Sequence, residues 1–107
     1  MRGVLDLCVM AALADGERYG YELAQHLERA GLGVVKGGTL YPLLARLEAA
    51  GLVTGEWRPG RQGQERKYYT LTRNGRHRLE EQTSAWDEFV AHTSALLDEG
   101  RGNCVER

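Results

Sequence analysis

Residues 36–71 have the sequence KGGTLYPLLARLEAAGLVTGEWRPGRQGQERKYYTL, which contains two successive patterns. The first half predicts a helix, because Gly51 stands where a left-handed helix end is favoured and four leucines share the spacing of one helix face: Leu40, Leu43, Leu44 and Leu47. In the second half, residues 52–57 and 67–71 have the β-branched and aromatic content of strands. The Arg-, Gly- and Gln-rich residues 58–66 between them predict the loop of a hairpin.

A helix that runs into a hairpin with a basic tip is the arrangement of a winged helix, and the preceding residues fit it. Residues 4–14 are apolar almost throughout and predict a helix that is covered on more than one side. A second helix is expected over residues 19–30, followed by a turn at Gly37-Gly38. The third helix is expected to begin at a Thr39 cap, with Pro42 in its first turn. The expected fold is mainly α-helical with a small β-ribbon, a winged helix-turn-helix.

Two parts of this region predict contacts with DNA. The third helix has a narrow face of mostly small residues opposite its leucines, and such a face can approach a groove closely. The hairpin carries one cluster of cationic residues that suits phosphates or a narrow minor groove: Arg58, Arg61, Arg66 and Lys67. The strand aromatics, Trp57 among them, are expected to brace the hairpin against the core. The residues expected to bind DNA are Tyr19, Lys36, Thr39, Tyr41, Pro42, Arg46, Arg61, Gln64, Arg66, Lys67 and Tyr68.

The formal net charge is only −1, but the charges are separated along the chain. Residues 36–78 hold nine Lys and Arg against three Glu, a balance of +6. Residues 79–107 hold two Arg against seven acids, and residues 1–35 hold three basic against five acidic residues. The basic region coincides with the predicted third helix and hairpin, so these elements are expected to present a cationic face that attracts phosphate.

The last part of the chain predicts a long helix that associates with a second copy. Thr72 is expected to cap this helix, which should run to Glu99. Its 3,4-spaced residues form a continuous seam that a single small domain cannot cover, so the seam predicts a homodimer. The expected interface residues are Val4, Leu79, Trp86, Val90, Thr93 and Leu97. The predicted organisation is a winged helix-turn-helix domain over residues 1–71, a dimerisation helix over residues 72–99 and a flexible tail over residues 100–107.

Three blocks resemble the PadR family of bacterial transcription regulators: YGYEL at residues 19–23, GTLYPLLARLEAAGLV at residues 38–53 and RKYYTLTRNGRHRL at residues 66–79. Their order and spacing make the resemblance specific, and it covers residues 4 to 99. It implies a homodimer joined through the first and last helices that binds a pseudo-palindromic operator on double-stranded DNA and usually represses transcription. With one C-terminal helix, the chain is similar to the short-tailed members of the family.

The same resemblance implies a ligand pocket. In some short-tailed members, a tryptophan at the position of Trp86 lines a hydrophobic pore at the dimer centre and stacks on planar drugs or dyes. The resemblance places Leu7, Met10, Ala85 and Phe89 beside Trp86 in this pocket. The expected ligand is a small aromatic or cationic molecule that relieves repression. The alternative is that Trp86 only fills the dimer interface.

Three other functional classes fit the sequence less well than a DNA-binding regulator. An enzyme is not expected, because both serines lie in the last helix and no nucleophile elbow is present. A metal-responsive repressor stays open, because Glu22 with His26 and His77 with Glu81 are i,i+4 pairs and the two cysteines could add ligands: Cys8 and Cys104. No Cys/His cluster has a recognised ligand spacing, so neither a metal site nor a cofactor is predicted. A winged helix that binds only protein is the remaining alternative.

The chain is expected to act in the cytoplasm. Its longest apolar run, within residues 4–14, contains Asp6 and is about half as long as a membrane span, and it lacks the n-region and cleavage site of a signal peptide. Two cysteines are poor evidence for a disulfide framework, which favours a reducing compartment.

Overall fold

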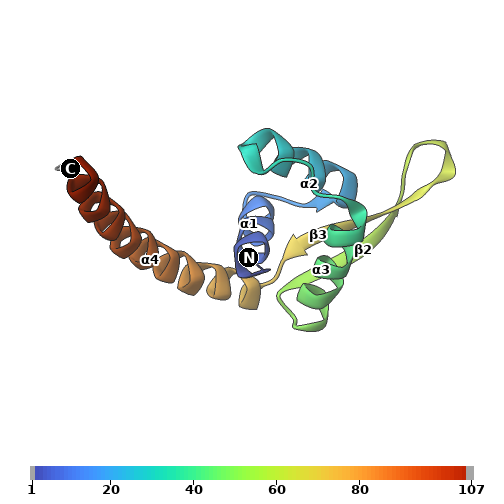
Figure 1. The fold of residues 1–107 in the computed structure, drawn as a ribbon. Helices are drawn as coiled ribbons and strands as arrows, with labels where there is room; N and C mark the ends of the chain where they lie inside the picture. The colour runs from blue at the N-terminus through green and yellow to red at the C-terminus, as the bar shows by residue number, and fades with distance from the viewer. Residues whose placement is uncertain (1, 106–107) are drawn as a thin grey trace.

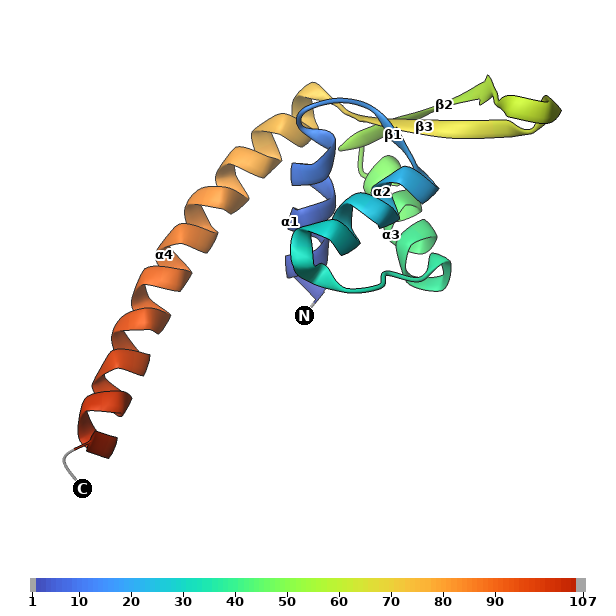
Figure 2. The same ribbon diagram turned by 90° about the horizontal axis from the view of Figure 1, so that it is seen from above.

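The structure is a computed structural model that describes the backbone of residues 2–105 and the side chains of residues 3–101. A helical body carries a long hairpin on one side and a long helix on another, and the two project in different directions (Figures 1 and 2). The elements in chain order are α1 (Arg2–Leu13), β1 (Arg18–Tyr19), α2 (Gly20–Leu27), η1 (Glu28–Leu32), α3 (Gly37–Ala49), β2 (Val53–Pro59), η2 (Arg61–Gly63), β3 (Glu65–Leu71) and α4 (Arg73–Val105). The predicted fold class is confirmed.

The core lies where α1, α2 and α3 meet the base of the hairpin. The predicted leucine face of α3 is buried, and each of its four leucines is at most 4% exposed. These leucines pack in one cluster with Val9, Met10 and Leu13 of α1, with Leu23 and Leu27 of α2, and with Val53, Tyr69 and Leu71 of the sheet. The 3.6-residue period therefore identified the buried face of α3 correctly.

The hairpin belongs to a three-stranded antiparallel sheet in the order β1-β3-β2. The two-residue strand β1 was not predicted, because a pair of residues carries no period. The hairpin strands are longer than expected: pairing continues from Val53↔Leu71 to Pro59↔Glu65, so Arg58 and Arg66 are strand residues rather than loop residues. The loop at the tip is therefore short, and the hairpin reaches far from the body (Figure 2).

Two helix boundaries differ from the prediction. The α-helical part of α2 ends at Leu27, and the wider turn of η1 follows; Gly31 then ends the helical run with a φ of +97°, which favours glycine. Helix α3 begins at Gly37 instead of Thr39, because the Lys36 carbonyl accepts hydrogen bonds from both Thr39 and Leu40. The cap residue is thus Lys36, and Pro42 lies in the second helical turn, not the first.

Helix α4 is fixed at its start and extends beyond its predicted end. Thr72 caps it as predicted, since its hydroxyl accepts a hydrogen bond from the Gly75 amide at 2.9 Å and donates one to the Gly51 carbonyl at 2.6 Å. Gly75 lies against the main chain: a β-carbon there would be 2.0 Å from the carbonyl oxygen of Leu52. The helix continues past Glu99 to Val105. Glycine lowers helix propensity, but the helix continues through Gly100.

Candidate nucleic-acid interface

Helix α3 presents an exposed face opposite its buried leucines, as predicted. Thr39, Pro42 and Ala45 are exposed on it, and Tyr41 is 51% exposed. The ring of Tyr41 leans back over the first residue of α2, where a β-carbon on Gly20 would be 2.3 Å from the tyrosine hydroxyl oxygen. Gly20 therefore leaves the space that lets Tyr41 lie between α2 and α3.

A recess of about 690 Å³ separates this helix from the hairpin. Tyr19, Gly20 and Tyr41 line it on the helical side, and Trp57, Lys67 and Tyr69 line it on the hairpin side. Helix α3 and the hairpin thus flank one hollow that carries aromatic rings and cations. Such a surface can hold a nucleic-acid backbone between two contacting elements.

The side of the hairpin that faces α3 holds the cross-strand pair Trp57↔Lys67. The prediction that Trp57 braces the hairpin on the core is wrong, because this ring is 61% exposed. The hairpin extends beyond the helical body (Figure 2). Tyr69 does pack in the core, at 6% exposure. Lys67 Nζ donates to Glu48 Oε1 of α3 at 2.9 Å, and this hydrogen bond raises the pKa of Lys67.

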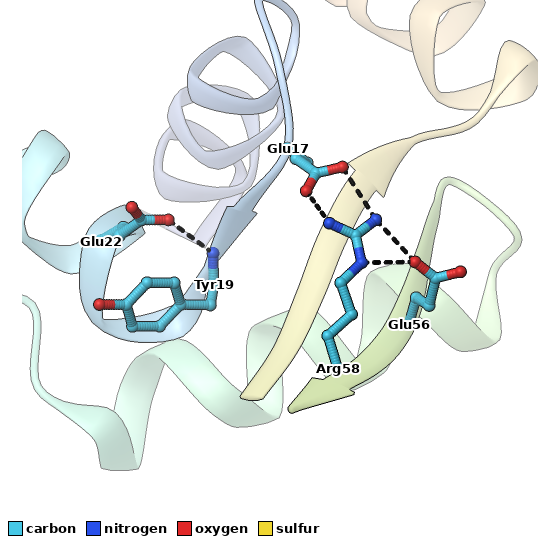
Figure 3. Close-up of polar contacts among 5 residues, drawn as sticks. All are labelled: Glu17, Tyr19, Glu22, Glu56 and Arg58. Carbon is cyan, nitrogen blue, oxygen red and sulfur yellow. Dashed lines mark hydrogen bonds and ion pairs between the residues drawn. The ribbon is translucent and has the colours of Figure 1, made fainter. Parts of the chain in front are cut away.

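The other side of the hairpin holds Arg58 between two carboxylates. Its guanidinium binds Glu17, which precedes β1, and donates from Nε to Glu56 Oε1 at 2.6 Å (Figure 3). These contacts raise the pKa of Arg58, and the hydrogen bonds from Arg58 hold the pKa of Glu17 below its ordinary value. The guanidinium also lies 4.8 Å from the centre of the Tyr68 ring, a cation–π distance.

Next to this cluster, Arg66 stacks on Tyr19, the residue before α2. The guanidinium carbon lies 4.5 Å from the centre of the Tyr19 ring, which in turn meets Tyr68 edge-on at 5.4 Å. Glu22 accepts a hydrogen bond from the Tyr19 amide at 3.3 Å and so closes the first turn of α2 (Figure 3). Arg66, Tyr19 and Tyr68 therefore contact one another in turn. These contacts bring the block at residues 19–23 against the block at residues 66–79.

The remaining predicted residues fall into two groups. Arg61 and Gln64 are exposed at the tip of the hairpin, and Lys36 is exposed at the start of α3. Within the side chains described, residues 3–101, neither Arg61 nor Arg66 forms an ion pair. Arg46 differs from them, because its Nη2 lies 2.7 Å from Oδ1 of Asp6 in α1.

Similarity to known proteins identifies the family of this chain. The model of the transcriptional regulator PadR-like family matches residues 9–81. The chain is 41% identical over 102 residues to the transcriptional regulator Rv3488 of Mycobacterium tuberculosis, a match that covers 95% of this chain and 94% of that protein. The chain belongs to the PadR-like family of transcriptional regulators.

Solved structures of PadR-like proteins have the same fold. A PadR-like transcriptional regulator from Bacillus cereus is 36% identical with a TM-score of 0.80, over 89% of this chain and 92% of that one. A PadR family regulator from Eggerthella lenta is also 36% identical, with a TM-score of 0.81 over 90% and 83% of the two chains. The predicted family is confirmed, and because its members are transcriptional regulators, so is the prediction that this protein is not an enzyme.

This PadR-like regulator also has an apolar hollow of about 280 Å³ between α1 and α4. Four of the five residues predicted for a ligand pocket line it: Leu7, Ala85, Trp86 and Phe89. Met10 instead lies in the core, 1% exposed, because it falls on the face of α1 that packs inside the domain. Gln82 also lines the hollow, and its buried Oε1 is the atom left without a hydrogen-bond partner among the described side chains.

The residues considered as metal ligands do not form a cluster in the described part of the chain. Among the residues that the structure describes, no group of three or more His, Cys, Asp or Glu side chains could hold a metal ion. His77 lies 3.9 Å from Glu81, and Glu22 is engaged with the Tyr19 amide. Cys8 is a free thiol, and the side chain of Cys104 lies outside the described residues. Within the described part of the chain, no helix has the length and apolarity to cross a bilayer.

Proposed function

We propose that this protein is a homodimeric, sequence-specific repressor in which α3 enters the major groove and the hairpin contacts the flanking phosphates. The observation that supports this most directly is the shared recess: Tyr41 of α3 and the cationic hairpin residues Arg66 and Lys67 line the same hollow. Tyr41 and Thr39 would read base edges from the groove. Arg61 and Arg66 would meet phosphates, since neither is neutralised by a carboxylate among the described side chains.

The dimer proposal rests on the exposed apolar residues of α4. This helix has 33 residues and a length of about 50 Å, and it extends from the body with α1 beside its first half (Figure 2). Phe89 is 54% exposed, and Leu96 and Leu97 are 68% and 61% exposed. A second copy packed along the seam would cover these side chains. Of the predicted interface residues, Leu79 packs partly against its own core, whereas Val90 is 40% exposed.

A symmetric dimer implies a pseudo-palindromic operator. Two α3 helices related by a two-fold axis read two half-sites that lie about 34 Å apart, or a multiple of one helical turn. The position of each winged domain relative to the axis would be set by α4, which is bonded to the base of the hairpin through Thr72. The packing of α4 in the dimer would therefore determine which half-site spacing the protein binds. Its proposed target is chromosomal DNA in the cytoplasm.

The hollow between α1 and α4 is the proposed site of an inducer. It is lined mainly by apolar groups, and Trp86 and Phe89 form a tilted pair with ring centres 5.9 Å apart. A planar aromatic ligand could stack there, and the unpaired Gln82 oxygen could accept a hydrogen bond from it. Because the site lies between the two proposed dimerisation helices, an occupied hollow would change their packing and relieve repression.

Selection of bound duplexes from a random library tests this proposal. The wild-type protein should enrich a sequence with two-fold-related half-sites, and the selected duplex should bind far more tightly than a scrambled duplex of equal length. Placed over a promoter in cell-free transcription, that duplex should give less transcript as the protein is added. A library that yields no enriched sequence would contradict the function, and an enriched sequence whose promoter gains transcript would contradict repression.

A further inference from the structure

The Lys67 side chain is held against the protein and is 25% exposed, so it does not extend freely from the hairpin. Its side chain lies across Gly55, where a β-carbon would be 2.2 Å from Lys67 Cε. The ammonium is 5.8 Å from the ring centre of Trp57 and 5.4 Å from that of Tyr69, and it donates to Glu48. Two aromatic rings and a carboxylate thus surround one cation.

The Lys67 pair connects the two elements that face DNA. Glu48 lies in α3, and Lys67 lies in β3 on the part of the hairpin that leaves the body. A Lys67 ammonium that reached a phosphate would have to release Glu48 and leave its place between the rings. The pair is also neutral as a unit, so it adds little to the attraction of the hairpin for phosphate.

Arg58 makes the equivalent connection from the other side. Residues 57 and 58 are consecutive in β2, and consecutive strand residues point to opposite sides of a sheet. The pair Trp57↔Lys67 therefore faces α3, whereas Arg58 faces Glu17 on the segment between α1 and β1. On one side of the hairpin Arg58 pairs with Glu17 (Figure 3), and on the other side Lys67 pairs with Glu48 of α3.

We propose that Lys67 and Arg58 are positioning residues that fix the angle between the hairpin and α3, and that Arg61 and Arg66 are the hairpin cations that contact DNA. This inference rests on the proposed function. The four hairpin cations look alike in the sequence, but their partners differ. Lys67 and Arg58 pair with carboxylates of the body, whereas Arg61 and Arg66 form no ion pair among the described side chains. Glu48 and Glu17 then become determinants of operator affinity although neither touches DNA.

The measurement is the dependence of affinity on salt, by fluorescence anisotropy with the duplex selected by the wild-type protein. Each phosphate contact contributes about 0.9 to the slope of log affinity against log salt. Arg61→Gln and Arg66→Gln should each make the slope shallower by about 0.9 for every phosphate that the dimer no longer binds. Lys67→Gln and Arg58→Gln should weaken binding with an unchanged slope, because they remove no phosphate contact. A Lys67→Gln slope as shallow as that of Arg61→Gln overturns the inference for Lys67, and the same result for Arg58→Gln overturns it for Arg58.

A charge exchange gives a second, independent readout for Lys67. Lys67→Glu alone opposes Glu48 and should weaken binding about fivefold or more. Adding Glu48→Lys restores an ion pair between the same positions and keeps the net charge of the wild type. Recovery of affinity to within about threefold of wild type supports positioning, because a lysine moved onto α3 cannot replace a cation of β3 at its phosphate.

The outcomes separate this inference from the proposed function. If the doubly exchanged protein melts like the wild type but binds as weakly as Lys67→Glu, Lys67 contacts DNA itself and the inference fails. If the exchanged protein does not fold, the slope of Lys67→Gln still decides. A wild-type protein that selects no duplex would instead contradict the proposed function.

Discussion

The ring of Tyr41 in α3 occupies the space above Gly20 at the start of α2, where a β-carbon would be 2.3 Å from the tyrosine hydroxyl and 2.7 Å from two ring carbons. One half of this contact comes from the block at residues 19–23 and the other from the block at residues 38–53. The contact fixes a half-exposed ring at the edge of the recess between α3 and the hairpin. A glycine outside the proposed groove-facing helix therefore controls where a side chain of that helix lies.

Gly20→Ala should weaken operator binding while the protein stays folded. The new methyl group displaces the exposed Tyr41 ring, and alanine is also the better helix former at this position. Discrimination between the selected and the scrambled duplex should fall by about tenfold, as for the removal of one base contact of about 1–3 kcal/mol. In a double-mutant cycle with Tyr41→Ala, the two effects should not add, because both remove the same ring. Additive losses in anisotropy titrations would contradict this coupling.

Gly75→Ala should destabilise the whole domain. Its methyl group would meet the Leu52 carbonyl at 2.0 Å, and backbone atoms at the base of the hairpin cannot rotate away. Overpacking of this kind costs about 1–3 kcal/mol, which thermal unfolding followed by circular dichroism can measure. Gly100→Ala is the matched control in the same helix, because no atom lies within 4 Å of its added methyl group. Its melting temperature should stay level or rise, and equal losses in both variants would rule out the clash.

Local patterns in the sequence predicted the elements of the fold but not the partners of its charges. The leucine period predicted the buried face of α3, and Thr72 was predicted as a cap. Each of these two signals is contained in a short stretch of sequence. Arg58 and Lys67 were read as one basic cluster with Arg61 and Arg66. Their partners lie 41 and 19 residues away in the sequence, and only the folded chain brings them together.

The exposure of Trp57 and the burial of Met10 were missed for a related reason. Alternation in a strand indicates which residues share a side, but not how far the strand extends beyond the core. Likewise, α1 is apolar almost all round, so its sequence cannot indicate which face packs inside and which faces α4. The sequence predicted the pocket residue Trp86 through a family resemblance, and the structure places it beside Leu7 and Phe89.

The tie between Glu17 and Arg58 should weaken in acid. Because Arg58 depresses the pKa of Glu17 in the folded state, the contribution of this carboxylate to stability is present above its unfolded pKa. That contribution disappears as the pH falls through the lower, folded value. Wild type should therefore melt above Glu17→Gln at neutral pH, and the difference should shrink in acid. A constant difference across the titration would show that the Glu17 charge makes no contribution.

Charge on the seam of α4 should separate the proposed dimer. Val90→Glu places a carboxylate where a second copy is expected to pack, and a charge buried without a partner is costly. Sedimentation at micromolar concentration should give a dimer for the wild type and a monomer or unfolded chain for the variant. Ala95→Glu is the control, since position 95 lies on the opposite side of the helix by its 3.6-residue period. A monomeric wild type, or equal dissociation of both variants, would contradict the seam as the interface.

Planar cationic dyes should bind the hollow between α1 and α4. Trp86 is 38% exposed there with Phe89 beside it, so a flat ligand can stack on the indole and gain cation–π attraction. Asp87 and Glu88 follow Trp86 directly, and acids outnumber basic residues over 79–107, which favours a cation over an anion. The expected result is quenching of tryptophan fluorescence by ethidium or an acridine at a defined stoichiometry per dimer.

The two tryptophans of the chain make this test specific to the hollow. Trp86→Ala leaves Trp57, which lies on the hairpin at 61% exposure and should be quenched only weakly and without saturation. Gln82→Leu keeps both indoles but removes the unpaired oxygen of the hollow, so dyes that donate an N–H should bind this variant more weakly than the wild type. Equal quenching of the wild type and Trp86→Ala would mean that the dyes report the hairpin, and Trp86 would then serve only to fill the proposed dimer interface.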